Sequence, residues 1–206
     1  MSAQPTPDLG EDGAMSTMPE ILSQATAAVA PIVRAAGEAD PAAATPCQEW
    51  VLSELTRHAL GTTAGLARLG RREPLDPDDP WGDPTTELPW SEQLSGQLED
   101  LATAWSDPGA WEGEVDMGGQ RMPASMIGDM VLAEVVLHGW DLARATGQRL
   151  ELPDAVARQL RRGIEETAAM GRQMGVYGDA VEVDEDAPDF DHALAAAGRD
   201  PAWSAN

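Results

Sequence analysis

Apolar residues along most of this chain recur at steps of three and four, the spacing that lines up side chains on one face of an α-helix. Six stretches carry the pattern, the last of them short and anchored by one leucine: 17–37, 51–69, 90–107, 122–147, 153–174 and 188–198. The stretches between them are rich in Pro, Gly and acidic residues and have no sustained period. The pattern therefore predicts an all-α protein.

The connections are expected to be long and irregular. Two prolines and small residues fill 40–50, and five prolines with many acidic residues fill 70–89, so neither is expected to form a helix. Glycine pairs and a little alternation at 109–119 predict a short hairpin or an extended loop. An extended acidic segment is expected at 175–186. Residues 1–16 lack apolar periodicity and are expected to be a disordered tail, which leaves 17–206 as a single domain.

The stretch 122–147 is apolar nearly all round, which predicts the central helix of the domain, ended by Gly147. Three polar residues interrupt it, and at about 100° per residue Glu134, His138 and Asp141 fall on one face. A buried carboxylate and imidazole are costly to desolvate without partners, and a divalent cation satisfies both. A simple hydrogen bond between them, or access to solvent at a cleft, is the plainer alternative.

The predicted second helix supplies another imidazole. Its inward-facing stripe consists of Val51, Leu55, His58, Thr62, Leu66 and Leu69. A lone His in an apolar stripe is more often a hydrogen-bonded core residue than a ligand. Together with Glu134 and His138, however, His58 gives two helices that present His, Glu and His to a shared interior, and helical bundles build metal sites in this way.

Composition restricts the classes of function. With 206 residues, 42% of them hydrophobic, the chain can bury one sizeable core. No apolar run suits a signal peptide or a membrane span, so a cytoplasmic protein is expected. The formal charge of −23 repels phosphate backbones and anionic lipids, which argues against nucleic-acid and membrane partners. Cys47 is the single cysteine, so a thiolate zinc site is excluded and His and carboxylate must hold any metal.

Three stretches resemble a known family. TPC at 45–47 with Trp50 precedes the second helix, LAEVVLHGWDLARATG covers 132–147, and GRDPAW covers 198–203. Over about residues 18–203 the chain resembles the actinobacterial DinB-like proteins of the mycothiol-dependent maleylpyruvate isomerase N-terminal family. The resemblance implies a DinB-like four-helix bundle, here with long connections and a short C-terminal extended segment and helix. It also implies a divalent metal, held by one His on the second helix and by a Glu and a His four residues apart on a later one.

Those ligand roles fall on His58, Glu134 and His138, the residues that helix geometry also selects. Three protein ligands leave an open coordination position, which is typical of reactive sites. Zinc is the first expectation, and nickel, iron, cobalt and manganese suit the same donors. The resemblance further implies a low-molecular-weight thiol such as mycothiol and a small electrophilic substrate, with isomerisation or S-transfer as the outcome. A homodimer is left open.

The neighbouring residues have candidate roles too. Asp141 leans toward His138, so it would accept the second imidazole N–H and support catalysis by fixing the tautomer; a pair with a basic group such as Arg144, or a cap on a neighbouring element, is the alternative. The family's Trp-Asp pair falls on Trp140 and Asp141. Trp140 and Arg144 are candidate cofactor-binding residues, with packing as the simpler role for the indole. Two rival functions remain, a non-catalytic metal or small-molecule binding module and a metal-dependent hydrolase, although no HExxH motif supplies a general base.

Overall fold

The computed structural model describes residues 16–47, 50–82, 84 and 89–205, so the disorder expected for residues 1–16 falls almost entirely outside the described residues. Its helices are α1 (Met18–Ala35), α2 (Leu52–Gly70), α3 (Trp90–Ala104), α4 (Ala124–Ala145), α5 (Asp154–Gln173) and α6 (Asp189–Ala196). A short 3-10 helix, η1 (Pro108–Trp111), precedes an antiparallel pair of strands, β1 (Glu114–Asp116) and β2 (Arg121–Pro123). All six predicted helices are present, and the all-α class is confirmed.

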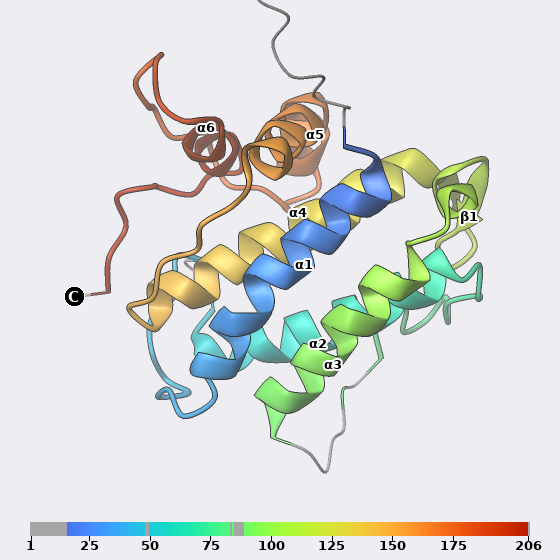
Figure 1. The fold of residues 1–206 in the computed structure, drawn as a ribbon, viewed down its shortest axis with the longest axis horizontal. Helices are drawn as coiled ribbons and strands as arrows, with labels where there is room; N and C mark the ends of the chain where they lie inside the picture. The colour runs from blue at the N-terminus through green and yellow to red at the C-terminus, as the bar shows by residue number, and fades with distance from the viewer. Residues whose placement is uncertain (1–15, 48–49, 83, 85–88, 206) are drawn as a thin grey trace, which may run out of the picture.

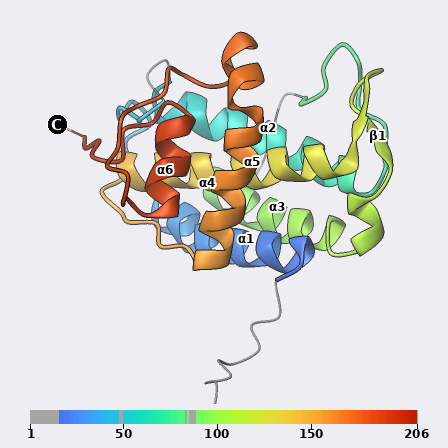
Figure 2. The same cartoon turned by 90° about the horizontal axis from the view of Figure 1, so that it is seen from above.

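Helices α1 to α4 form a four-helix bundle around one apolar core (Figure 1). Within the bundle, α1 and α2 each pack against both α3 and α4. Helices α5 and α6 pack on each other and lie across α4 on the outside of the bundle (Figure 2). Because α4 is covered by α1, α2 and α5, it is buried on nearly every side, as its apolar sequence predicts. None of the helices in the described ranges is long and apolar enough to cross a membrane.

A glycine on α4 allows α1 to pack closely against it. A Cβ atom placed on Gly139 would lie 2.5 Å from a methyl group of Val29, well inside van der Waals contact. Val29 is 3% exposed and belongs to the core. The small residue next to His138 therefore fixes the distance between the first helix and the helix that carries two of the candidate ligands.

Most helix boundaries differ from the prediction by one to three residues, and two of these differences have a clear structural cause. Helix α4 begins at Ala124 rather than at 122, because residues 121–123 pair with 114–116 as a hairpin and Pro123 caps the helix from an extended conformation. Helix α3 ends at Ala104 rather than 107. There Trp105 turns into the core with no exposed surface, and its indole N–H donates to the carbonyl oxygen of Leu66 at 2.9 Å. Short strands have no apolar period long enough to be predicted.

Candidate metal centre

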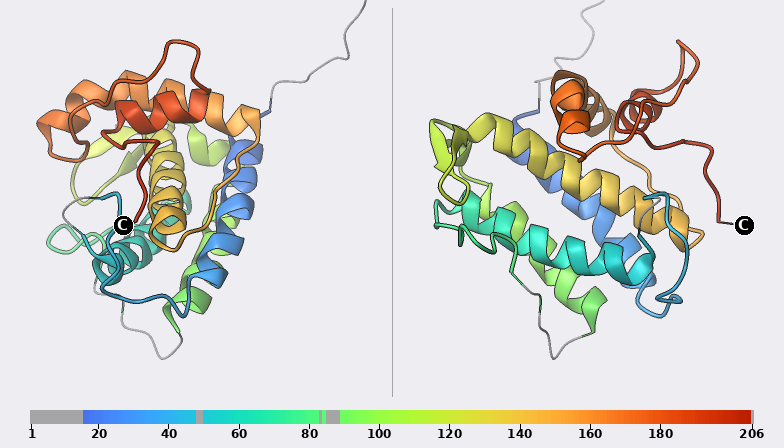
Figure 3. Two further views of the ribbon diagram at one scale, coloured as in Figure 1. Left: turned by 90° about the vertical axis from the view of Figure 1, so that its left-hand side faces the viewer. Right: turned by 180° about the vertical axis from the view of Figure 1, so that it is seen from behind.

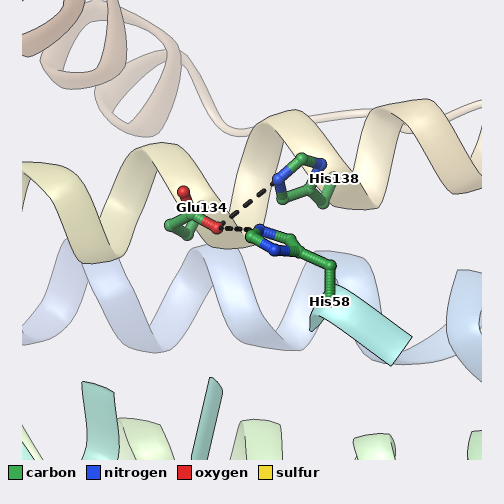
Figure 4. A group of neighbouring side chains, drawn as sticks. All are labelled: His58, Glu134 and His138. Carbon is green, nitrogen blue, oxygen red and sulfur yellow. Dashed lines mark hydrogen bonds and ion pairs between the residues drawn. The ribbon is translucent and has the colours of Figure 1, made fainter. Parts of the chain in front are cut away.

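The two helices that bear the predicted ligands bring them to one point. His58 lies on α2, and Glu134 and His138 lie on successive turns of α4, which packs against α2 (Figure 4). The Glu134 Oε2 atom lies 3.1 Å from Nε2 of His58 and 3.4 Å from Nε2 of His138. The three ligand atoms all lie within 4.8 Å of one another. The structure thus brings together the three predicted side chains; their role as ligands stays a prediction.

The centre lies at the wall of the bundle rather than deep in its core. The side chains of His58, Glu134 and His138 are 27%, 22% and 12% exposed, so His58 is the most accessible of the three. In the predicted stripe of α2, Leu55 and the residues after His58 are buried as expected. Val51 was placed wrongly, because it caps α2 from an extended conformation and is 38% exposed.

An indole covers the two imidazoles. The Trp50 ring lies with its centroid 4.6 Å from that of His58 and 5.9 Å from that of His138, and the two imidazole centroids are 4.8 Å apart. Three rings at these distances pack as an aromatic cluster. Trp50 therefore forms one wall of the centre and restricts the rotation of both imidazoles.

Asp141 lies behind His138, on the side away from Glu134. It has no exposed surface, and its Oδ2 atom accepts a hydrogen bond from Nδ1 of His138 at 3.0 Å. This is the contact that the lean of helical side chains predicts. Asp141 forms its ion pair with Arg199, which donates to the two carboxylate oxygens at 3.0 and 2.8 Å. The expected pair with a basic group thus forms with Arg199, 58 positions after Asp141, rather than with the nearby Arg144.

Trp140 and Arg144 lie together on another side of α4. The Arg144 guanidinium lies over the Trp140 ring, 5.8 Å from its centroid, and donates a hydrogen bond to the carbonyl oxygen of Trp203. Trp140 is 5% exposed and belongs to the core. These contacts match the packing role weighed for Trp140 and connect the C-terminal residues to α4. A cofactor-binding role for the pair stays a prediction.

Sequence reasoning missed Trp50 and Arg199 as members of the centre. Neither residue belongs to a helical stripe, since Trp50 precedes α2 and Arg199 follows α6. Both lie in stretches that carry the family resemblance, at 45–50 and 198–203. That resemblance was the available signal, but it gave no indication of which residues they contact.

The charges of the centre shift the pKa values of its members. Burial raises the pKa of Glu134, but the charges and hydrogen bonds of His138 and His58 outweigh it and hold this pKa well below its ordinary value. Burial lowers the pKa of His138, but Glu134 and Asp141 outweigh it and raise this pKa to about 9. Without a metal, His138 is therefore an imidazolium at neutral pH that donates from both ring nitrogens.

This raised pKa predicts how stability depends on pH in the metal-free protein. A folded-state pKa above the unfolded value stabilises the protein below about pH 6.5, and the stabilisation is lost as the pH rises through about 9. We expect the free energy of unfolding to fall by on the order of 1–3 kcal/mol across that window because of His138. Urea unfolding of the wild-type protein and of a His138→Gln variant, at several pH values, measures this fall in the free energy of unfolding. Parallel pH curves for the two proteins would contradict the assignment.

Two of the three separations between the ligand atoms match those expected around a divalent ion, and all three lie within 4.8 Å. Tetrahedral coordination with bonds of about 2.0–2.1 Å separates ligand atoms by roughly 3.3 Å, and the two separations from Glu134 Oε2 are 3.1 and 3.4 Å. Two imidazole nitrogens and one carboxylate oxygen suit zinc and the neighbouring first-row metals. Among the residues described, this is the group of His, Cys, Asp and Glu side chains whose ligand atoms converge in this way.

A pocket of about 360 Å³ opens beside His58. The residues that line it include Trp50, Arg57, Thr62 and Trp81. Two indoles supply apolar surface, Arg57 supplies a positive charge, and Glu54 and Asp79, which also line the pocket, supply negative charges. This combination of apolar walls and a few polar groups is typical of small-molecule sites.

Comparison with known proteins places the chain in a family. The family model for the mycothiol maleylpyruvate isomerase N-terminal domain matches residues 22–143. Two uncharacterised proteins of Mycobacterium tuberculosis, from strains CDC 1551 and H37Rv, are each 26% identical over 113 residues, which is 55% of this chain and 58% of theirs. The match thus spans little more than half of their length.

Two solved structures share the fold. They are the mycothiol-dependent maleylpyruvate isomerase and a histidine-to-alanine mutant of it, with TM-scores of 0.50 and 0.51 and identities of 20% and 19%. Each comparison covers 76% of this chain and 73% of the other. The likeness confirms the DinB-like bundle expected from the sequence. On the family match over residues 22–143, the chain belongs to the mycothiol maleylpyruvate isomerase N-terminal domain family.

Proposed function

We propose that this protein binds a divalent metal ion, zinc in the first place, through His58, Glu134 and His138. With it the protein uses a low-molecular-weight thiol of the mycothiol type to act on a small electrophilic metabolite. The observation that carries the proposal is the convergence of two imidazole nitrogens and a carboxylate oxygen, from helices far apart in the sequence, within 4.8 Å. Membership of a family named for mycothiol and maleylpyruvate isomerase supports the choice of thiol.

The chemistry requires a thiolate close to the electrophile. A divalent ion bound at such a centre stabilises the thiolate form of a thiol, which is the nucleophilic form. His58 and His138 serve as neutral nitrogen donors, and Glu134 offsets one positive charge. Asp141 holds the Nδ1–H of His138, so Nε2 of that ring faces Glu134 and His58. Trp50 packs against both imidazoles and restricts their rotation.

The pocket beside His58 supports a small substrate. Its volume of about 360 Å³ is in the range of small-molecule sites, and its wall reaches the centre through His58 and Trp50. The indoles of Trp50 and Trp81 suit the apolar part of a substrate. A thiol that leaves again after adding to the substrate gives isomerisation, and a thiol that stays attached gives S-transfer.

The test combines metal analysis with a thiol assay. We expect purified protein to take up zinc stoichiometrically and, in the zinc-loaded form, to consume or recycle mycothiol with at least one member of a panel of electrophiles that includes maleylpyruvate. A His58→Ala variant should lose the activity together with the metal. Stoichiometric zinc without any thiol-dependent reaction would replace this proposal by a metal-binding module. Hydrolysis without thiol would indicate a hydrolase, and the absence of metal binding would overturn the proposal altogether.

A further inference from the structure

A chain of buried hydrogen bonds joins the C-terminal segment to the metal centre. Arg199 Nε donates to Asp141 Oδ1 at 3.0 Å, and Arg199 Nη2 donates to Oδ2 at 2.8 Å. The same Oδ2 atom accepts from Nδ1 of His138 at 3.0 Å. Asp141 has no exposed surface, and Arg199 is 8% exposed. The guanidinium thus holds the carboxylate at two points, and the carboxylate in turn fixes the plane of the imidazole.

In the metal-loaded protein, Arg199 can balance the charge of Asp141 and His138 cannot. An imidazole that binds a metal is neutral, so His138 cannot offset the charge of Asp141 in the loaded protein. A carboxylate without a counter-ion at 0% exposure is strongly disfavoured and would lose its charge or change its position. Arg199 is permanently charged and lies against both carboxylate oxygens. It therefore keeps Asp141 an ionised acceptor while His138 serves as a ligand.

The turn that ends α6 positions Arg199. At the end of α6, the Gly198 N–H donates to the carbonyl of Ala195 at 3.0 Å and the Arg199 N–H donates to that of Leu194 at 2.9 Å. With Gly198 at φ +81°, this is the Schellman arrangement that ends a helix. A Cβ atom on Gly198 would lie 2.6 Å from the Cα atom of Gly178, so the close approach of two backbones also requires glycine. Beyond the turn the chain runs back beside α4 (Figure 3).

We propose that Arg199 is a positioning residue of the metal centre, which acts on His138 through Asp141. The residues after α6 thereby complete a centre whose ligands all lie on α2 and α4. This inference rests on the proposed function for its metal. It adds to that function a residue outside the stretch 22–143 that the family model matches.

The control for a merely structural role is Arg172. Its Nη1 atom donates to the carbonyl oxygen of Ala196 at 3.1 Å, so it attaches α6 to α5 close to Arg199. It makes no hydrogen bond to Asp141 in the described part of the chain. An Arg172→Gln variant therefore loosens the same segment and leaves the contacts of Asp141 intact.

The first measurement is zinc affinity, by competition with a chromophoric chelator, for the full-length wild type, Arg199→Gln, Arg199→Lys and Arg172→Gln. We expect Arg199→Gln to weaken zinc binding by about 10–100-fold and Arg172→Gln to leave it unchanged. Arg199→Lys keeps the charge but not the two-point contact, so its affinity should lie between them. A folded Arg199→Gln variant with wild-type affinity would overturn the inference. Should that variant not fold, wild-type affinity of Arg199→Lys would overturn it instead.

The second measurement needs no metal. In the metal-free protein, the Nδ1–H proton of His138, held by Asp141, should give a downfield proton NMR signal in slow exchange with water. We expect the same signal in wild type and Arg172→Gln and a shifted or broadened one in the Arg199 variants, in which the Asp141 carboxylate is no longer held at two points. If the wild-type protein binds no zinc, the proposed function is wrong. The NMR signal then decides by itself whether Arg199 positions His138. An unchanged signal in both Arg199 variants would then reject that role.

Discussion

Replacing His138 with alanine should abolish stoichiometric metal binding while the bundle stays folded. The variant removes one of three ligand atoms from the centre. The charges left behind keep partners, because Glu134 Oε2 remains 3.1 Å from His58 and Asp141 remains paired with Arg199. The lost ring leaves a partly exposed gap, for which we expect a cost of about 1–3 kcal/mol in the metal-free protein. Metal content after loading and dialysis, together with thermal unfolding, measures both effects.

The chain offers a matched control for this experiment. It has three histidines, and His192 on α6 is the one outside the centre. Its Nε2 atom lies 3.3 Å from the carbonyl oxygen of Glu185. We expect His192→Ala to bind metal as wild type does. Full metal occupancy in His138→Ala would reject the ligand assignment.

Replacing Asp141 with alanine should destabilise the protein more than any change at an exposed ion pair. The variant leaves Arg199, 8% exposed, without its counter-ion in the interior. Breaking a buried pair by removal of one partner costs about 3–5 kcal/mol, because the remaining charge is uncompensated. Urea unfolding of the metal-free protein measures the loss.

The control pair is Arg161 with Asp189, also an arginine and an aspartate at 3.0 Å, but with both side chains 35% exposed. We expect Asp189→Ala to cost no more than about 1 kcal/mol. A double variant, Asp141→Leu with Arg199→Met, removes both buried charges and should recover most of the lost stability. It should not recover zinc affinity, since no group then holds Nδ1 of His138. Equal costs for Asp141→Ala and Asp189→Ala would contradict a buried ionic pair.

The helices were predictable because their signal is local. Each one has an apolar face repeated over several turns, and α4 shows by its all-round apolar sequence that other elements cover it. The hairpin was predicted only as one of two options. Strands of three residues have no period of their own, and Met122 continues the apolar pattern of α4 although it lies in β2.

The three candidate ligands were predictable for a related reason. A helix of known phase fixes the direction of its side chains, so the sequence alone assigns His58, Glu134 and His138 to facing surfaces. The counter-ion of Asp141 was not predictable in this way. Arg144 is its neighbour on the helix surface, whereas Arg199 reaches Asp141 only because α5 packs on α4 and α6 packs on α5. Contacts that depend on how helices dock against each other do not appear as a periodic pattern in the sequence.

The Glu134 carboxylate that joins His58 and His138 has a consequence for how an ion enters and leaves. The donor atoms lie on two helices that pack around one core, so the bundle itself gathers them and capture requires little ordering of the chain. The ion displaces protons from ligand side chains that the bundle already holds in position. Unlike small zinc domains that collapse when a chelator is added, this bundle should survive stripping and reload repeatedly, and one preparation can be compared with different metals.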